Sequence, residues 1–269
     1  QEFDWGLGWI TTAYALRSIV GAVLAPLAGW MGDRFGTRRI MIFAAVTYVV
    51  GLVLLGTMEH IWQLYLYYSF VLGISQAMFR VNIPTTVAAW FKTRLGVATG
   101  IQQSAGGMGT SIMAPALAFL LSRADWNTAI WIIAAVGGVI VFALILLFRG
   151  DPSERGMRPY GADEQSSAPP PKAMAPEITK IRSQVFLQHA RRTSAFWNLI
   201  AIHHLGCVGH AIVFVGVIFY ATTRGIALDA AAIIITIYSL ASIGSRLMTP
   251  ILADNFGAKG VMALAYFIQ

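Results

Sequence analysis

Seven long runs of predominantly apolar residues dominate this chain, and an eighth begins near Val261. Each run is long enough for an α-helix that crosses the hydrocarbon core of a membrane, which takes about 20 residues. The composition agrees, because 57% of the residues are hydrophobic, only 12% are charged and the mean hydropathy is +0.66. We therefore predict an all-α membrane protein with about seven complete transmembrane helices and part of an eighth; the runs are 7–31, 40–58, 62–89, 95–121, 128–148, 196–221 and 230–253.

Lysine and arginine are distributed unevenly over the loops between these runs. If the loop around Asp33 faces the cytoplasm, the loops on that side hold 14 of the 19 basic residues, and the opposite side holds only Arg123 and Arg224. Cytoplasmic loops of membrane proteins retain positive charge, so this count fixes the orientation. Because the charge lies in short loops rather than on one face of a soluble module, the net charge of +7 does not indicate nucleic-acid binding.

The composition changes between residues 150 and 195, where Pro, Ser, Ala and charged residues replace the apolar runs. Such a segment cannot form a packed core and is typical of a flexible linker. We predict an N-terminal helical bundle at 1–149, a cytoplasmic linker at 150–195 and the start of a C-terminal bundle at 196–269. The segment from Ile178 to Arg192 mixes apolar and basic residues, which fits either a helix on the inner membrane surface or a partly helical soluble tether.

A charged tract, Gly29-Trp-Met-Gly-Asp-Arg-Phe-Gly-Thr-Arg-Arg39, separates the first two apolar runs. Its spacing, Gly-x-x-x-Asp-Arg-x-Gly-x-Arg-Arg, resembles the loop signature of the major facilitator superfamily of twelve-helix secondary transporters. A weaker copy spans 250–259 and places Asp254 221 residues after Asp33. An internal repeat at this distance fits two related six-helix bundles.

The resemblance implies a major facilitator fold in which the runs match family helices two to six, seven, eight and part of nine. We therefore expect a fragment that lacks the first helix and the last three or four. The resemblance also implies a cytoplasmic gate, and its candidate residues are Asp33, Arg34, Arg38 and Asp254. In the second copy Asn255 replaces the arginine and Pro250 the glycine, so we expect that copy to be mainly a packing relic.

The stretch from Trp90 to Gly109 narrows the resemblance. It opens on a basic turn, continues into a glycine-rich helix and looks like the corresponding element of monocarboxylate transporters and oxalate:formate antiporters. Matches fall at Phe91, Arg94, Ala98, Gly100 and Gly109, whereas Thr93, Leu95 and Ala105 depart from the pattern. Small residues let membrane helices pack closely, either as static packing or as surfaces on which two bundles rock, and the candidates for this are Gly96, Gly100, Gly106 and Gly109.

Three arginines, Arg246, Arg80 and Arg17, fall within the apolar runs. An arginine near the bilayer centre is costly and usually faces a cavity, a partner or a ligand. Arg246 precedes Asp254 by eight residues, or about 12 Å along a helix, and in the resembling families an arginine at this position pairs with the substrate carboxylate. Arg80 is a candidate for the substrate path or for gating. Arg17 either joins the substrate path, snorkels to the outer surface or contacts helix ends. Alternatively, Arg246 pairs with an acid or with helix carbonyls in the C-terminal part that we expect to be missing.

Two histidines of one apolar run, His203 and His210, are spaced i, i+7 and therefore share a helix face. They fit either of two roles, coupling of transport to protons or a hydrogen bond to a neighbouring helix. No acid lies nearby to complete a metal site, and the single Cys207 excludes a disulfide framework.

We predict a secondary active transporter that carries a small organic anion, a monocarboxylate or dicarboxylate, by alternating access with proton symport or anion exchange. Proton-driven efflux of a drug or metabolite is the alternative, and a transporter-like sensor is a third reading. We expect no enzyme activity, no cofactor, no nucleic-acid partner, a monomer, and a multi-pass location in a bacterial inner membrane.

Overall fold

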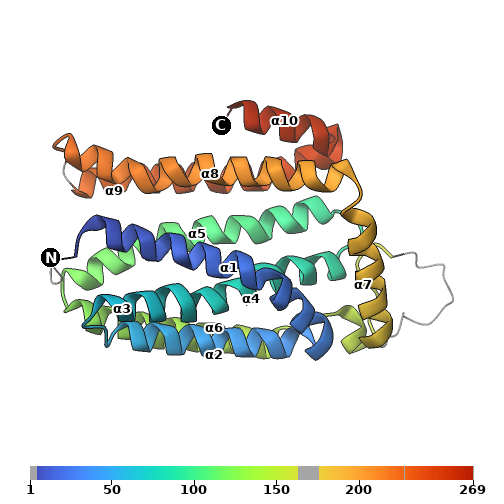
Figure 1. The fold of residues 1–269 in the computed structure, drawn as a ribbon, viewed down its shortest axis with the longest axis horizontal. Helices are drawn as coiled ribbons and strands as arrows, with labels where there is room; N and C mark the ends of the chain where they lie inside the picture. Colours follow the sequence, from blue (N-terminus) through green and yellow to red (C-terminus); the bar gives the residue numbers. More distant parts are fainter. Residues whose placement is uncertain (1–4, 163–175, 227, 269) are drawn as a thin grey trace. The chain divides into compact units, whose positions relative to one another are not determined.

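The computed structural model describes residues 5–162, 176–226 and 228–268, and at some positions inside the helices only the backbone. Long helices joined by short turns account for most of this part (Figure 1). The elements are α1 (Leu7–Phe35), α2 (Thr37–Leu55), α3 (Ile61–Gln63), the π-helical stretch η1 (Leu64–Val71), α4 (Leu72–Trp90), α5 (Leu95–Leu121), α6 (Trp126–Leu147), the 3₁₀ turn η2 (Pro152–Arg155), α7 (Pro176–Ala190), α8 (Ser194–Thr223), α9 (Leu228–Phe256) and α10 (Ala258–Ile268).

Each predicted run coincides with helix in the structure. The run 62–89 corresponds to α3, η1 and α4, which follow one another without a break. Within the described residues, three helices are long and apolar enough to cross a membrane: Gly8–Phe35, Thr37–Leu55 and Trp126–Leu147. The all-α membrane fold class is therefore confirmed.

The helices form two compact units. Unit 1 comprises residues 1–93 and 115–172, and unit 2 comprises residues 94–114 and 173–269. The first part of α5 thus belongs to unit 2 and its last turns to unit 1. The division at 1–149, 150–195 and 196–269, drawn from composition, stays a prediction.

Small side chains lie where the helices of unit 1 meet. Ala28 of α1 and Ala44 of α2 are completely buried, and they form one core cluster with Ile40 and Met78. Buried hydroxyls add bonds between helices: Ser69 donates to the carbonyl of Ala13 at 2.8 Å, and Ser75 donates to that of Ala44 at 2.9 Å. Close approach and interhelical hydrogen bonds stabilise membrane helices, whose lipid surroundings are as apolar as their own surfaces.

In unit 2, α8 and α10 both pack against α9. Helix α10 also approaches α8 closely. Gly206 of α8 allows this contact, because a Cβ at Gly206 would overlap the ring of Tyr266 on α10. Unit 2 therefore uses small residues at its helix contacts in the same way as unit 1.

Candidate functional site

The turn between α1 and α2 is built on a glycine. Gly36 is the only residue between the two helices; it adopts φ +85°, a conformation that glycine takes without strain, and its N–H donates to the Gly32 carbonyl at 3.0 Å. The guanidinium carbon of Arg34 lies 5.3 Å from the ring centroid of Trp30 and 5.6 Å from that of Phe35. The turn therefore presents a cation held over two aromatic rings.

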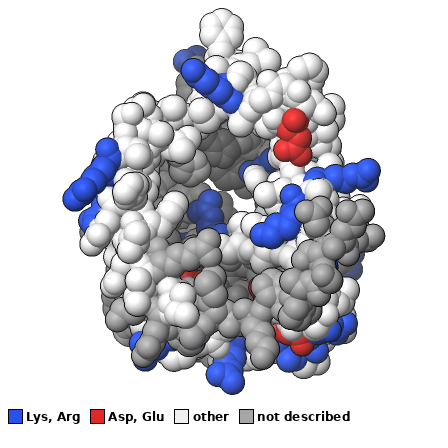
Figure 2. Space-filling view, turned by 90° about the vertical axis from the view of Figure 1, so that its right-hand side faces the viewer, with Lys and Arg blue, Asp and Glu red and all other residues white. Residues whose placement is uncertain are grey.

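The other charged residues of this turn differ in their contacts. Asp33 is exposed, whereas Arg38 donates from Nη2 to the carbonyl of Leu146 at 3.4 Å and so joins the start of α2 to the end of α6. Figure 2 views the molecule from the end to which this turn belongs, and lysine and arginine stand out there against a largely uncharged surface. The gate role of Asp33, Arg34 and Arg38 stays a prediction.

The structure explains why the tract has a second glycine at position 32. A Cβ at Gly32 would overlap Oδ1 of Asn82 on α4. Asn82 is buried, and its Nδ2 donates to the carbonyls of Met78 at 2.9 Å and Ala28 at 3.4 Å. The motif glycine thus lets a hydrogen-bonded amide fit between α1 and α4.

The second copy of the tract repeats this geometry in unit 2. Gly257 adopts φ +87°, and its N–H donates to the Ala253 carbonyl at 3.0 Å, as Gly36 does to Gly32. In addition, Oδ2 of Asp254 accepts a hydrogen bond from the backbone N–H of Gly96 at 3.1 Å. Because Gly96 lies in the first turn of α5, the carboxylate satisfies an N–H that the helix leaves unpaired and lies at the positive end of the helix dipole. The second copy, expected to be mainly a packing relic, therefore has a defined electrostatic contact.

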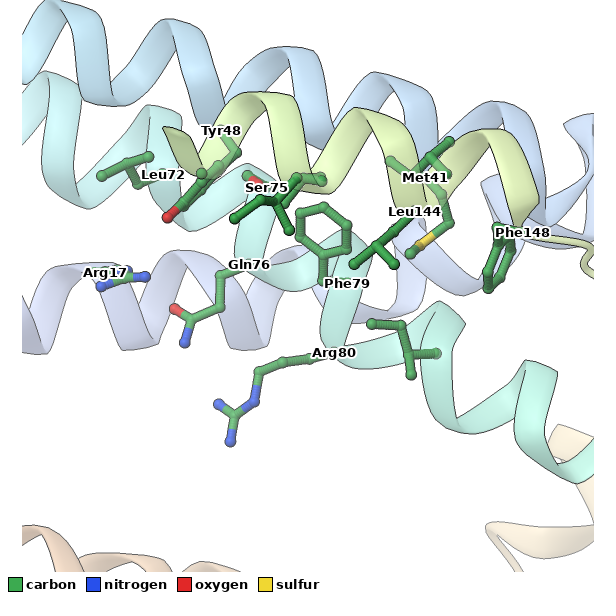
Figure 3. Close-up of a pocket in the computed structure, with 15 residues that line it drawn as sticks. Arg17, Met41, Tyr48, Leu72, Ser75, Gln76, Phe79, Arg80, Leu144 and Phe148 are labelled. Carbon is green, nitrogen blue, oxygen red and sulfur yellow. The ribbon is translucent and has the colours of Figure 1, made fainter. Parts of the chain in front are cut away.

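Unit 1 contains a cavity of about 620 Å³ lined by α1, α2, α4, α6 and their neighbours. Its polar residues are Arg17, Tyr48, Ser75, Gln76 and Arg80. Figure 3 shows the side chains of Gln76 and Arg80 extending from α4 toward the same side, away from Met41, Leu144 and Phe148. The structure therefore brings two of the three arginines singled out in the sequence, Arg17 and Arg80, to one cavity.

Arg17 and Arg80 have different surroundings. The guanidinium carbon of Arg17 lies 4.8 Å from the ring centroid of Tyr68, and its buried Nε has no hydrogen-bond partner in the described structure. The Arg80 side chain is exposed. A buried N–H donor without a partner is costly, so the Nε of Arg17 lowers the stability of this arrangement.

The residues that line the cavity are spaced in the sequence like the residues of one helix face. The lining residues of α4 run from Leu72 to Ile83, and those of α6 run from Gly137 to Ile145 and continue to Phe148, directly after the helix. Both sets recur at i, i+3, i+4, i+7, i+8 and i+11. This spacing is one continuous helix face, which on α6 is entirely apolar and typical of a surface for packing. Only the polar rim formed by Arg17, Gln76 and Arg80 is suited to attract an anion.

Arg246 lies on α9 in unit 2, at its contact with the first part of α5. Its Nη1 donates to the carbonyl of Gln103 at 3.4 Å, and within the described residues no acidic side chain pairs with it. The guanidinium group has five N–H donors, so one long hydrogen bond leaves donors for a ligand. Arg246 is thus half-buried at the contact between α5 and α9 and retains unused donors.

The α5 face toward α9 is made of small residues. A Cβ at Gly100 would lie 3.2 Å from the carbonyl oxygen of Leu247, and one at Gly106 would lie 3.6 Å from Nη1 of Arg246. A Cβ at Gly109 would meet nothing within 4 Å, so its packing role stays a prediction. Sequence reasoning missed Gly107, where a Cβ would come within 2.8 Å of Ile243.

Other contacts were also missed from the sequence. Ser104 donates to the Ile243 carbonyl at 3.2 Å, and the four-residue spacing of Gly96, Gly100 and Ser104 is the signal that would have indicated it. For Tyr48, Tyr68 and Gln76 around the cavity, no signal in the sequence distinguished them from ordinary helix residues. The side chains of His203, His210 and Cys207 lie outside the described part, and the described residues contain no group of three His, Cys, Asp or Glu that fits a metal ion.

Comparisons with known proteins agree with this architecture. The chain is 22% identical to an MFS-type transporter of Aspergillus fumigatus over 97% of its length, and 21% identical to the oxalate:formate antiporter of Oxalobacter formigenes over 98%. It is 23% identical to human monocarboxylate transporter 11 over 92% of its length. The chain spans 58%, 58% and 48% of these three relatives.

The family model of the Major Facilitator Superfamily matches residues 2–269, nearly the whole chain. The helices, the two glycine turns 221 residues apart and the relatives all agree with this match. The chain therefore belongs to the Major Facilitator Superfamily of membrane transporters.

Proposed function

We propose that the protein is a secondary active transporter that carries a small organic anion, a monocarboxylate or a dicarboxylate, by alternating access. The single observation that carries the proposal is Arg246, an arginine of the predicted run 230–253 that is held by one long hydrogen bond and is unpaired by any described acid. Its planar guanidinium can donate two parallel hydrogen bonds to one carboxylate. A carboxylate that leaves water would recover its hydrogen bonds there.

The positive charge of the arginines around the cavity supports an anionic substrate. Arg17 and Arg80 belong to the polar rim of the unit 1 cavity, and neither has a hydrogen bond or ion pair to an acid within the described residues. Cations without acidic partners in a low-dielectric region create a positive potential that attracts anions and disfavours cations. We assign Arg246 to the substrate carboxylate, and Arg80 and Arg17 to the substrate path.

The names of two relatives support a small carboxylate as the substrate. One relative is an oxalate:formate antiporter and another is a monocarboxylate transporter. Both names describe small carboxylates, which supports the same class for this chain. Coupling would be by proton symport, with His203 or His210 as the titrating group, or by anion exchange.

We further propose that Asp33, Arg34, Arg38 and Asp254 form the cytoplasmic gate. The contact between Asp254 and Gly96 supports this, because a bond between a charged side chain and a helix end can be made and broken without unfolding either helix. We place the protein as a monomer in a bacterial inner membrane, with the 150–195 segment in the cytoplasm and no nucleic-acid partner.

The test is uptake of radiolabelled lactate, pyruvate, formate and oxalate into proteoliposomes that contain the full-length protein, with and without a pH gradient. We expect saturable uptake that Arg246→Ala abolishes and Arg246→Lys only partly restores, because an ammonium cannot form the bidentate pair. Arg123→Ala is the matched control, since Arg123 is exposed beyond the end of α5 and contacts the ring of Phe119. Uptake that is indifferent to Arg246 would overturn the proposal.

One observation favours the alternative, proton-driven export of a larger drug or metabolite. The unit 1 cavity of about 620 Å³ is lined mainly by apolar side chains, and cavities of about 300–1,000 Å³ hold drug-sized ligands. Export of an amphipathic dye that Arg246→Ala leaves unchanged would support this second function.

A further inference from the structure

Helix α7 exposes apolar side chains along one face. Ile178, Ile181 and Val185 are 55%, 60% and 55% exposed, and Phe186 beside them is 71% exposed. Their positions i, i+3, i+7 and i+8 place them on one side of the helix, and Leu187, 47% exposed, lies on the other side. A helix that leaves such a face uncovered requires an apolar surface to cover it.

The junction between α7 and α8 fixes the direction of this helix. The Trp197 indole N–H donates to the Arg191 carbonyl at 2.9 Å, and Thr193 Oγ1 donates to the Ala190 carbonyl at 2.7 Å. The backbone N–H of Phe196 donates to Thr193 Oγ1 at 3.4 Å. Both helices belong to unit 2, and Figure 1 shows α7 running across the direction of α8. If α8 crosses the membrane, as the run 196–221 predicts, α7 lies along the membrane plane.

The residues between α7 and α8 indicate where this junction lies relative to the membrane surface. Phe196 and Trp197 pack edge to face with ring centroids 5.4 Å apart, and Trp197 is 57% exposed. Tryptophan at the end of a membrane helix anchors it at the boundary between acyl chains and headgroups. Arg191 and Arg192, both exposed, shortly precede Trp197 in the chain, so an anchor at this boundary would place them near the headgroups.

We propose that α7 is a lipid-binding helix that lies on the cytoplasmic membrane surface, with its apolar face in the acyl boundary and Arg191 and Arg192 on the phosphates of anionic lipids. Charge complementarity selects this occupant, because guanidinium pairs with phosphate and the cytoplasmic leaflet is the anionic one. The exposed apolar face supplies the second attachment that stable surface binding needs. The proposal concerns membrane attachment and does not depend on which solute the protein carries.

The experiment uses the full-length protein without native cysteines, labelled with an environment-sensitive NBD fluorophore at Val185→Cys. The matched control is Gln184→Cys, an exposed neighbour that lies about 100° around the helix. Each variant is placed in vesicles of phosphatidylcholine alone or mixed with phosphatidylglycerol. Quenching of the fluorophore by brominated acyl chains reports its contact with the lipid.

We expect severalfold stronger quenching and a blue-shifted emission at position 185 than at position 184. Phosphatidylglycerol should increase both, and Arg191→Glu combined with Arg192→Glu should remove that increase. Equal quenching at the two positions would overturn the proposal, and so would quenching at 185 that is independent of both the anionic lipid and the arginines. Gel filtration shows whether the double charge reversal folds. If it does not, the test is the comparison of positions 185 and 184 in the two lipid mixtures, made in protein that keeps both arginines.

Discussion

The contact between Gly96 and Asp254 allows a sharp prediction about Gly96→Ala. The Gly96 N–H donates to Oδ2 of Asp254 at 3.1 Å. A Cβ at Gly96 would overlap this carboxylate and lie 2.7 Å from the backbone carbonyl oxygen of Pro250. The carboxylate can rotate away, but the backbone carbonyl moves only if α5 and α9 separate.

The expected cost follows from these two contacts. Hydrogen bonds between membrane helices contribute about 0.6 kcal/mol on average and up to about 1.7 kcal/mol, and bonds to charged groups in water-soluble proteins contribute about 1.5–3 kcal/mol. We take about 1–2 kcal/mol for this partly buried bond and add about 1–3 kcal/mol for overpacking. Replacing glycine in a helix returns up to about 1 kcal/mol. Gly96→Ala should therefore lower the free energy of unfolding by about 1–5 kcal/mol.

The assay is unfolding of the full-length protein by SDS in mixed micelles, followed by circular dichroism. Gly109→Ala is the matched control in the same helix, because a Cβ there would meet nothing within 4 Å. It should leave stability unchanged or raise it by up to about 1 kcal/mol. Asp254→Asn keeps an acceptor but loses the charge, so it should cost less than Gly96→Ala. If Gly96→Ala is as stable as Gly109→Ala, the contact contributes nothing and the reasoning is refuted.

Three further predictions follow from contacts within single units. Gly36→Ala and Gly257→Ala should each lower the free energy of unfolding by about 1–2 kcal/mol, because both positions have positive φ, where a Cβ is strained. Gly32→Ala should destabilise the native protein but not an Asn82→Ala background, where the overlapping amide is gone, so a double-mutant cycle should show strong coupling. Arg17→Gln should raise the KM for anion uptake severalfold at similar protein yield, because it removes a charge from the polar rim.

These three predictions have a common control for the glycine variants, and each has its own contradicting result. Gly21→Ala lies in α1, where a Cβ would meet nothing within 4 Å, and should not destabilise. Additive effects of Gly32→Ala and Asn82→Ala would contradict the predicted overlap. An unchanged KM in Arg17→Gln would remove Arg17 from the substrate path, while leaving the role of Arg246 open to its own test.

The helices were predictable because each apolar run is long enough to satisfy its own backbone hydrogen bonds in lipid. The α1–α2 turn was predictable as well, since few residues other than glycine allow so short a reversal between two helices as Gly36 makes. The second turn at Gly257 followed from the repeat. The contact partner of Asp254 was not predictable, because its hydrogen bond joins residues that are 158 positions apart.

The sequence by itself determined which segments are helical, where the chain turns and which end carries the positive charge. These properties depend on local composition and on the hydrophobic requirement of each helix taken alone. Only the tertiary structure decided that Arg17 and Arg80 share a cavity and that Gly107 as well as Gly100 faces α9. An all-apolar helix has little preference for one face, so its rotation about its own axis is set by the fit of small residues and hydrogen bonds against its neighbours.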